Sequence, residues 1–342
     1  GEGITTPDPI TLQAVLASFV YHNISKAVME VSSHSLSQFR VHGLLFDTAI
    51  FTNLSHDHLD YHKNFDAYFA SKLGLFKRVL SPEGSVVINM DDARGHEIHE
   101  ISKLRGQDII TVGQHNCDLT LKKCNFDATG QQILFSWHDE IKSIRLDLIG
   151  YFQAMNILQA AALVIACGEQ PNNVFDTLSE LKTVSGRMQL AAKRANGASI
   201  FVDYAHTPDA VETALKAMRP HVMGRLLIIV GAGGDRDVSK RELIGRAAEK
   251  YADVVFVTDD NPRSEDPELI RKAIMHGCPN ATEIGDRATA ILTGVDALNP
   301  GDALLIAGKG HETGQIIGDD ILAFNDVEQA SISVSTLDEL LP

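Results

Sequence analysis

The second half of the chain alternates between short apolar runs and amphipathic segments, and this alternation narrows the possible folds more than any other feature. We predict buried strands at Ser199–Asp203, Leu226–Val230, Val254–Val257 and Ala303–Ala307. We predict helices near Pro208–Met218, Lys240–Tyr251, Pro267–His276 and Arg287–Leu298. Continuously apolar strands separated by helices are typical of a doubly wound α/β domain with a parallel core sheet.

The first half also contains strands and helices, but it ends differently. We predict strands at Ala27–Val31, Thr48–Thr52, Ser85–Asn89 and Asp108–Val112, and helices within Thr5–His22 and Asn64–Leu80. Three further strands with short turns predict a small antiparallel meander: Leu119–Phe126, Gln131–Trp137 and Lys142–Leu148. Two more helices follow, near Phe152–Cys167 and Asn172–Lys182. The composition changes at Ser185–Met188, and the regular alternation of strands and helices begins after it. We therefore predict two α/β domains, residues 1–184 and 185–342.

The composition is that of an ordinary globular protein, with 342 residues, 44% hydrophobic and 22% charged. The net charge of -15 argues against nucleic acid as a partner, although local Arg and Lys could bind a small anion. None of the four cysteines forms a C-x-x-C pair, so a reducing cytoplasm is the expected compartment. We expect neither a signal peptide nor membrane insertion, because no apolar run approaches about 20 residues. The chain opens on Gly1 without an initiator Met, which predicts a fragment.

Two polar features of the first half suggest metal or phosphate chemistry. Glu30 lies in a predicted buried strand, where a carboxylate is costly, so it is either an edge residue or a metal ligand. The run Asn53–His62 follows another strand and contains three histidines and two aspartates, His56, Asp57, His58, Asp60 and His62. It nearly matches the metallo-β-lactamase pattern, but Tyr61 stands where a His is needed. The alternative is a set of surface histidines that cap a helix.

Lys72 lies between the apolar residues of the predicted helix Asn64–Leu80. Partial burial there would favour the neutral amine, which is the form that adds carbon dioxide. The alternative is an ordinary lysine on a helix face.

Three loops of the second half follow predicted strands. Thr258–Arg263 contains two carboxylates, an amide and a guanidinium just past the strand Val254–Val257. Pro262 ends that strand, because it has no N–H to donate to a neighbouring strand. Gly231–Arg236 lacks the third glycine of the G-x-G-x-x-G rule, which excludes a nicotinamide site but allows an anion nest. Gly308–Glu312 lacks the spacing of a Walker A loop.

Loops after parallel strands meet at one edge of a sheet, so Arg236, Asp260–Arg263 and Glu312 are expected in one site. Guanidinium groups beside carboxylates suit a ligand with both carboxylate and ammonium groups, such as an amino acid. For the stretch Thr258–Arg263 alone, the alternative is a strand-end turn with a solvated Arg.

Six short motifs occur in order along nearly the whole chain: Glu30–His34, Thr52–His62, Gly186–Met188, Asp203–Pro208, Asp260–Arg263 and Gly308–Glu312. Together they resemble the Mur ligase family of peptidoglycan synthesis, and within it the MurE type. The resemblance implies a central ATPase domain followed by a C-terminal Rossmann-like domain that binds the incoming amino acid. It implies ATP-dependent addition of meso-2,6-diaminopimelate to UDP-N-acetylmuramoyl-L-alanyl-D-glutamate through an acyl phosphate, by a cytoplasmic monomer.

The resemblance also implies roles for individual residues. Contacts to the muramoyl dipeptide are expected from Thr5, Thr6, Ser32, Gln38 and Arg40. The magnesium site is expected at Glu30, His58 and Lys72, the last in carbamoylated form. Contacts to the nucleotide are expected from Asn156, Arg187, Asp203 and His206. The amino-acid pocket is expected from Arg236, Asp260, Asn261, Pro262, Arg263, Gly308 and Glu312.

Asp260–Arg263 is the family's signature for meso-diaminopimelate. In this interpretation Arg263 holds the carboxylate at the far end of the diaminoacid. Lysine lacks that carboxylate, and the unpaired guanidinium would reject it.

The sequence departs from the family pattern in several places. No G-x-x-x-x-G-K-[ST] phosphate loop occurs, and the UDP-binding domain is missing, so we expect a chain that is incomplete at its N-terminus. Gln153 replaces the first Asn of the family's G-x-F-N-x-x-N pattern, and Ile4 stands where an Asn is common.

Four hypotheses therefore stand. They are a ligase for diaminopimelate, a non-catalytic fragment that only binds the amino acid, a folylpolyglutamate synthetase or lysine-adding relative, and a metallo-hydrolase.

Overall fold

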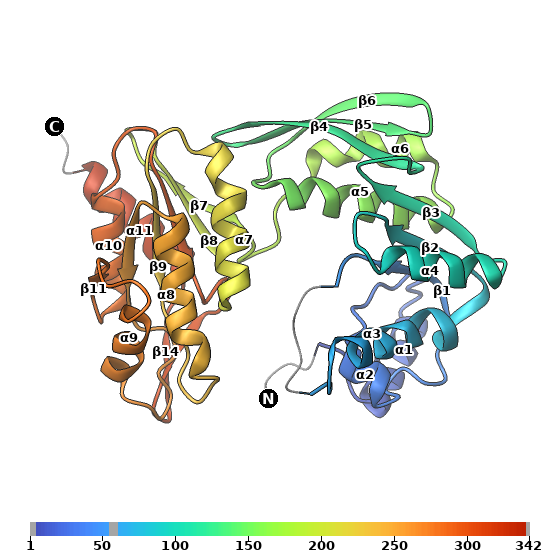
Figure 1. The fold of residues 1–342 in the computed structure, drawn as a ribbon, viewed down its shortest axis with the longest axis horizontal. Coiled ribbons are helices and arrows are strands. Elements are labelled where there is room, and N and C mark those ends of the chain that lie inside the picture. The colour runs from blue at the N-terminus through green and yellow to red at the C-terminus, as the bar shows by residue number, and fades with distance from the viewer. Residues whose placement is uncertain (1–4, 55–60, 340–342) are drawn as a thin grey trace. The chain divides into compact units, whose positions relative to one another are not determined.

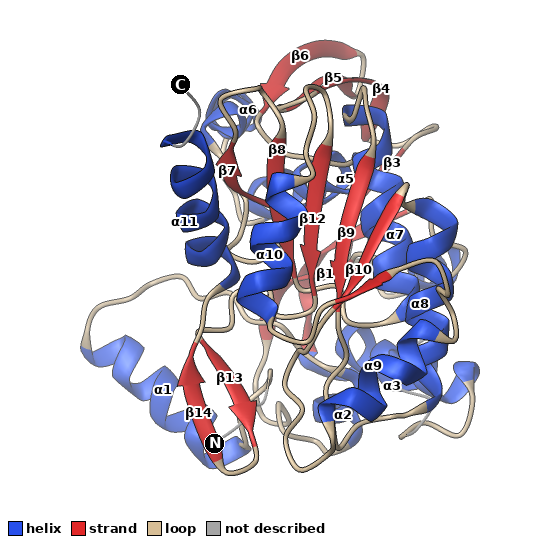
Figure 2. Cartoon of the chain, turned by 90° about the vertical axis from the view of Figure 1, so that its left-hand side faces the viewer, coloured by secondary structure: helices blue, strands red, loops and turns tan. Residues whose placement is uncertain are grey.

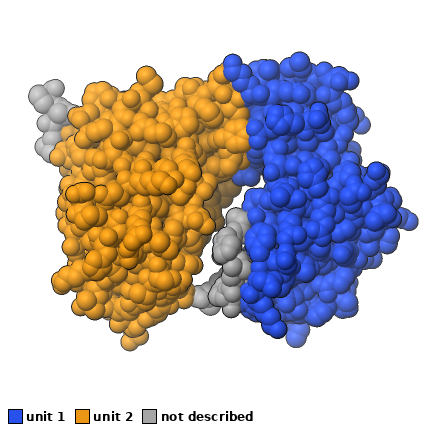
Figure 3. Space-filling view, in the orientation of Figure 1, with its two compact units in different colours: residues 1–123, 133–144, 155–178 blue, residues 124–132, 145–154, 179–342 orange. Residues whose placement is uncertain are grey.

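The computed structural model describes residues 5–54 and 61–339. The chain separates into two compact units (Figure 3), and each is described by itself. Unit 1 comprises residues 1–123, 133–144 and 155–178, and unit 2 comprises residues 124–132, 145–154 and 179–342. In the described part of the chain, no helix is both long and apolar enough to cross a membrane.

The first sheet of the chain has the order β1-β2-β3-β4-β5-β6 (Figure 1), and most of its residues belong to unit 1. Its first strands are β1 (Phe46–Phe51), β2 (Leu80–Asn89), β3 (Asp108–Gly113) and β4 (Leu119–Asp127), paired in parallel. Strands β5 (Gly130–Trp137) and β6 (Glu140–Leu146) complete the sheet after two-residue connections. The predicted meander is therefore a continuation of the parallel strands within one sheet.

Helices connect and cover these strands. They are α1 (Pro9–Tyr21), α2 (Ser33–Ser37), α3 (Phe65–Gly74), α4 (Gly95–Leu104), α5 (Tyr151–Ala166) and α6 (Pro171–Thr177). Asp8 begins α1 by accepting from the backbone of Ile10 and Thr11, and Asn64 begins α3 in the same way. Helix α3 runs into a π-helix, Leu75–Val79, a form that sequence periodicity does not distinguish from an α-helix. A short 3₁₀ helix, Leu178–Glu180, follows α6.

One predicted strand of the first unit is wrong. Residues Ala27–Val31 form no strand, and the side chain of Val28 is 88% exposed. A short apolar run becomes a strand only where a neighbouring strand supplies ladder hydrogen bonds, and no described strand lies beside this segment. Glu30 is consequently exposed, so the inference from a buried carboxylate does not hold.

The second unit is a three-layer α/β/α arrangement around a sheet with the order β11-β10-β9-β12-β8-β7 (Figure 2). The strands are β7 (Gln189–Lys193), β8 (Ser199–Asp203), β9 (Leu226–Val230), β10 (Val254–Val257), β11 (Thr282–Glu283) and β12 (Ala303–Ala307). All pairings are parallel except that of β7 with β8. The predicted doubly wound domain is confirmed, and the four predicted core strands have the predicted bounds.

Both faces of this sheet are covered. Helices α7 (Pro208–Met218), α8 (Ser239–Tyr251) and α9 (Pro267–Met275) pack on the face that contains Phe201, Ile228 and Leu305. Helices α10 (Arg287–Asp296) and α11 (Asp326–Glu339) pack on the face that contains Ile200, Ile229 and Leu304. A 3₁₀ helix, Arg219–His221, follows α7, and strands β13 (Gly314–Ile317) and β14 (Asp320–Ala323) form a separate antiparallel hairpin.

Candidate functional site

Four loops of the second unit leave the carboxyl ends of neighbouring parallel strands. They follow β8, β9, β10 and β12, and they contain Asp203–His206, Gly231–Arg236, Thr258–Arg263 and Gly308–Glu312. In open α/β sheets this edge is where ligands bind. The loops also contact one another, as the hydrogen bonds below show.

The loops after β9 and β10 are locked together through their backbones. Gly234 donates its N–H to the carbonyl of Asn261 over 2.9 Å, and Nη1 of Arg263 donates to the carbonyl of Gly234 over 2.8 Å. A Cβ atom on Gly234 would overlap the carbonyl of Pro262, so only glycine allows this approach. Pro262 is itself buried at the contact.

Arg263 has an unusual backbone conformation, with a φ of 52° that side chains other than glycine rarely adopt. Its N–H donates to Ile316 over 3.0 Å and its carbonyl accepts from Gly318 over 2.7 Å, so hairpin β13–β14 holds the strained backbone. The half-buried guanidinium has Gly234 as its one hydrogen-bond partner among the described residues. The remaining N–H groups of the fork are therefore available to a carboxylate.

Asn261, Glu312 and Lys309 form a closed triangle beside Arg263. The amide of Asn261 donates Nδ2–H to Oε2 of Glu312 over 2.8 Å. The ammonium of Lys309 donates to that same carboxylate oxygen over 2.8 Å and to Oδ1 of Asn261 over 2.9 Å. Burial raises the pKa of Glu312, but the hydrogen bonds from Lys309 and Asn261 outweigh it, so the pKa lies below its ordinary value.

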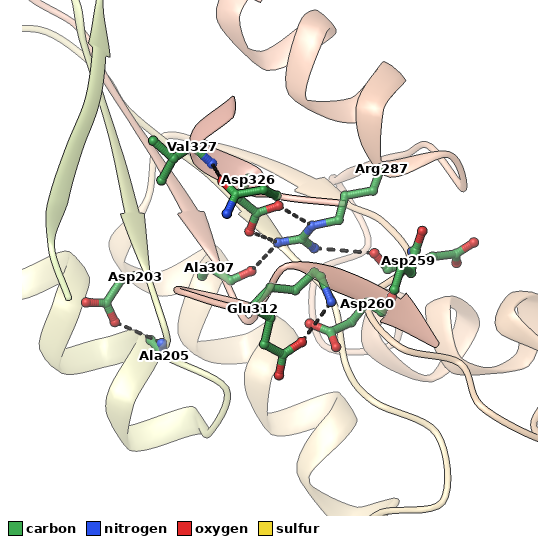
Figure 4. A network of polar contacts seen from close by, with 12 residues as sticks. Asp203, Ala205, Asp259, Asp260, Arg287, Ala307, Glu312, Asp326 and Val327 are labelled. Atoms are coloured by element: carbon green, nitrogen blue, oxygen red, sulfur yellow. Dashed lines mark hydrogen bonds and ion pairs between the residues drawn. The ribbon is translucent and has the colours of Figure 1, made fainter. Parts of the chain in front are cut away.

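A buried ion pair contacts the ends of β10 and β12 through the carbonyls of Asp259 and Ala307 (Figure 4). Arg287 and Asp326 are both fully buried and form a bidentate pair, with N–O distances of 2.8 and 2.7 Å. The same guanidinium donates to the carbonyl of Ala307 over 2.9 Å and to that of Asp259 over 3.3 Å. Asp260 is also buried, and its Oδ1 accepts from the backbone N–H of Asn261 over 2.7 Å.

A second group of expected residues gathers around Tyr204. The guanidinium of Arg187 lies 4.9 Å above this ring, and the rings of His206 and His311 lie 4.7 and 5.5 Å from it. A Cβ on Gly186 would overlap the backbone N of His311, so the Gly186–Met188 and Gly308–Glu312 segments touch.

Asp203 lies beneath this group and faces the backbone. Its carboxylate accepts from the N–H groups of Met188 and Ala205 over 2.7 and 2.8 Å. Burial raises its pKa, and these two hydrogen bonds offset the rise only in part. Asp203 thus joins two segments of the site.

Arg236 is exposed on the loop after β9, and Gly308, with a φ of 113°, is buried against Asp260. Asn156 lies on the exposed face of α5 in the first unit.

The residues expected to bind the muramoyl dipeptide lie together in the first unit. Thr6 is buried, and its Oγ1 donates to the carbonyl of Glu30 over 2.9 Å and accepts from the N–H of Ser32 over 3.1 Å. Arg40 donates to the carbonyl of Thr6 over 3.0 Å and to Oε1 of Gln38 over 2.9 and 2.6 Å. Thr5 is exposed beside Thr6.

The expected magnesium residues are only partly described. His58 lies outside the described residues, as do His56, Asp57 and Asp60. Within residues 5–54 and 61–339, no group of three His, Cys, Asp or Glu side chains could hold a metal ion. Lys72 is half-buried, as expected, with its ammonium 5.1 Å from the centre of the Tyr68 ring. His62 hydrogen-bonds Ser33 over 3.0 Å.

Sequence reasoning missed three residues of the second-unit site, namely Lys309, Arg287 and Tyr204. Lys309 stands in the motif Gly308–Glu312, from which only Gly308 and Glu312 were expected in the pocket. Arg287 begins a predicted helix, where an Arg ordinarily faces solvent. Only the packing of α10 against the sheet buries it.

The fold and these loops define an α/β protein whose Rossmann-like unit has an Arg with open donors beside an acidic acceptor. Family comparison agrees with this class. Residues 1–164 match the Mur ligase middle domain, and residues 186–310 match the Mur ligase glutamate ligase domain.

Two relatives carry the name UDP-N-acetylmuramoyl-L-alanyl-D-glutamate–2,6-diaminopimelate ligase. The one from Bradyrhizobium diazoefficiens is 42% identical over 337 residues, which cover 97% of this chain and 69% of that protein. The one from Chelativorans sp. is 44% identical over 326 residues, which cover 95% and 68%. A solved structure with the same name is 32% identical, with a TM-score of 0.70 and coverage of 97% and 69%.

The chain belongs to the Mur ligase family, and its similarity to the diaminopimelate-adding type extends over nearly its whole length. The predicted resemblance is confirmed, and the metallo-hydrolase hypothesis finds no support. A Mycobacterium tuberculosis folylpolyglutamate synthase complexed with ADP and AMPPCP is 20% identical with a TM-score of 0.61, over 86% of this chain and 64% of that one. It shares the fold alone.

Proposed function

We propose that this chain supplies the catalytic and amino-acid-binding parts of an ATP-dependent ligase. The enzyme adds meso-diaminopimelate to UDP-N-acetylmuramoyl-L-alanyl-D-glutamate during peptidoglycan synthesis. The names and coverage of the relatives support this function over that of a chain that only binds an amino acid. We propose the domain boundary at residues 184 and 185, and a cytoplasmic location, which the four free cysteines support.

The observation that carries the proposal is that Arg263 and Glu312 lie in one site, joined through the loop residue Asn261. The guanidinium, fixed by a strained backbone and by Gly234, suits the carboxylate at the far end of the diaminoacid. Glu312, kept ionised, suits an ammonium group of the same ligand. Both contacts would orient the other amino group of diaminopimelate for attack on the activated carboxyl of the muramoyl dipeptide.

The first unit would bind the other substrate. Thr6, Ser32, Gln38 and Arg40 are joined by hydrogen bonds, and we propose that they hold the muramoyl dipeptide together with the adjacent Thr5. Arg187 and His206, whose side chains contact the Tyr204 ring, and Asn156 on α5 are proposed nucleotide contacts, while Asp203 positions the backbone of Met188 and Ala205.

The reaction begins with transfer of the ATP γ-phosphoryl group to the substrate carboxylate. The resulting acyl phosphate loses phosphate when the amine attacks and gives the amide. We propose that Glu30, His58 and carbamoylated Lys72 hold Mg²⁺, which would neutralise charge on the transferring phosphoryl group; carboxylate oxygens suit this ion. Lys72 is half-buried, with its Nζ 5.1 Å from the centre of the Tyr68 ring, and we propose that it is the residue that is carbamoylated.

The test measures tripeptide formation by mass spectrometry and ADP release with the 342-residue chain, ATP, Mg²⁺, the muramoyl dipeptide and meso-diaminopimelate. Binding of diaminopimelate is measured in parallel by calorimetry. Binding without ADP release or tripeptide would establish the alternative of a chain that only binds the amino acid.

Arg263→Lys keeps the charge but loses the planar fork. We expect it to raise the KM for diaminopimelate roughly 10- to 100-fold at similar kcat, which corresponds to one charge-assisted hydrogen-bond pair. The matched control is Arg246→Lys on the exposed side of α8, which should leave both constants unchanged. An unchanged KM in Arg263→Lys would contradict the pocket assignment.

A further inference from the structure

Lys309 is a lysine with no access to solvent, and its surroundings explain how it is tolerated. Its side chain is 0% exposed, and the ammonium donates to Asn261 Oδ1 over 2.9 Å, Glu312 Oε2 over 2.8 Å and the carbonyl of Gly314 over 2.7 Å. An ammonium has three N–H donors, so all three are used. Lys309 therefore cannot contact a substrate itself.

The backbone around Lys309 is shaped for this position. It lies between Gly308, with a φ of 113°, and Gly310, with a φ of 54°. A Cβ on Gly308 would lie 2.5 Å from Oδ2 of Asp260, and one on Gly310 would lie 2.7 Å from Cβ of Tyr204. The two glycines let the chain pass between these residues and direct the lysine beneath the pocket.

The three acceptors of Lys309 come from three parts of the amino-acid pocket. Asn261 belongs to the loop after β10, Glu312 to the loop after β12, and Gly314 begins the hairpin that holds the backbone of Arg263. Oε2 of Glu312 is shared between Lys309 and Asn261, at 2.8 Å from each donor. Oε1 has no partner among the described residues, and the side chain is 32% exposed. One carboxylate oxygen is thus fixed and the other remains open to a ligand.

We propose that Lys309 is a positioning residue that orients Glu312 and Asn261, so that Oε1 of Glu312 accepts from an ammonium group of the amino-acid substrate. This inference rests on the proposed function. It assigns Lys309 to amino-acid binding and not to the chemistry of ATP. Without the lysine, Glu312 loses one of the two donors that fix Oε2, and Asn261 also loses the ammonium that holds its Oδ1.

The main test compares Lys309→Met and Lys309→Gln with the unaltered chain in the ligase assay. We expect the KM for diaminopimelate to rise roughly 10- to 100-fold, while kcat and the KM for ATP stay within about threefold, because an oriented charge-assisted hydrogen bond is lost from binding. The matched control is Lys216→Met, a lysine of α7 that is 56% exposed and paired with Glu212. It should change none of the three constants.

A double-mutant cycle with Glu312→Gln separates positioning from folding. If Lys309 acts through Glu312, then Lys309→Met should change the KM for diaminopimelate much less in the Glu312→Gln background than in the unaltered chain. A lysine with a purely structural role would lower the melting temperature and leave this KM unchanged in both backgrounds, which would overturn the proposal.

A measurement on the unaltered chain keeps the proposal testable if the lysine variants do not fold. The carboxyl carbon-13 signal of Glu312, assigned with Glu312→Gln, should titrate below the ordinary pKa of a glutamate. Besides Lys309, the charged or titratable groups that act on this carboxylate are Arg263, Arg287 and Tyr204. An ordinary or raised pKa would contradict the proposal.

These outcomes differ from those of the proposed function. If the unaltered chain neither binds diaminopimelate nor forms the tripeptide, the proposed function fails. If it does either and Lys309→Met has the same affinity for diaminopimelate, only the role of Lys309 fails.

Discussion

The buried pair of Arg287 and Asp326 offers a quantitative test of how the site is supported. In Arg287→Met the carboxylate of Asp326 stays buried without its bidentate partner. The carbonyl of Ala307, at the end of β12, also loses its donor at 2.9 Å. Methionine fills similar space, so the change removes charge and hydrogen bonds with little loss of volume.

The expected loss in the free energy of unfolding is about 4 kcal/mol. Breaking a fully buried ion pair by removing one partner costs about 3–5 kcal/mol. An unsatisfied buried carbonyl costs about 1–3 kcal/mol, but the two contributions share one guanidinium and do not simply add. A whole domain is stable by only about 5–15 kcal/mol, so this single residue should matter greatly.

Removing both charges should cost less than removing one. In Arg287→Met with Asp326→Leu, no buried charge is left unpaired, so the remaining loss should be that of the unsatisfied Ala307 carbonyl, about 1–3 kcal/mol. Helix α11 keeps its start, because Asn325 accepts from the N–H groups of Val327 and Glu328.

The assay is urea unfolding followed by far-ultraviolet circular dichroism, with hydrogen exchange of the β8 and β12 amides reporting on the second unit alone. Arg246→Met, on the exposed side of α8, is the control and should cost less than about 0.5 kcal/mol. The reasoning is refuted if Arg287→Met costs under about 1 kcal/mol, or if the double variant costs as much as the two single variants together.

Two further predictions concern the second unit. Gly186→Ala should lower the stability of this unit by at least about 2 kcal/mol, because the residue has a φ of 68° and its Cβ would overlap His311. The control is Gly197→Ala, which has a φ of 92° but open space around its Cβ, and it should cost only about 1 kcal/mol. Equal melting temperatures of the two variants would contradict this prediction. Burial lowers the pKa of His221, whose Nδ1–H donates to Asp127 while Nε2 accepts from Gly150 over 3.0 Å. The unfolded chain binds the proton of this histidine more tightly than the folded chain does. The stabilisation by neutral His221 is therefore complete above about pH 6.5, and it is lost as the pH falls toward the lowered pKa of the folded state. His221→Gln should reduce the fall in melting temperature between pH 7.5 and pH 5.5. An unchanged dependence of the melting temperature on pH would contradict the assignment.

The second unit was predictable because local pattern and tertiary environment agree there. The runs Leu226–Val230 and Ala303–Ala307 are apolar on both faces, and only a parallel strand between two helical layers satisfies that pattern. The same logic brought Asp260–Arg263 and Glu312 to one edge of the sheet, where Asn261 now hydrogen-bonds Glu312. Their roles in binding stay predictions.

The first unit shows where this logic stops. Ala27–Val31 has the composition of a buried strand, yet it is exposed, because a strand depends on a neighbour that no local pattern specifies. Lys72 was correctly expected to be partly buried, since its position between apolar residues of one helix is a local property. The prediction for His58 lies outside the described residues.

The sequence alone determined the order of strands and helices in the second unit, the loops that carry its polar residues, and the family. These follow from periodicity and from short motifs, which are local along the chain. Only the tertiary structure decided which basic side chains keep open donors and which are fully enclosed. Arg263 and Lys309 are both basic residues just after a strand, but one guanidinium keeps open donors while the ammonium of the other is enclosed by three acceptors. That difference depends on which loops the sheet brings together, because burial and electrostatic environment are set by neighbours distant in sequence.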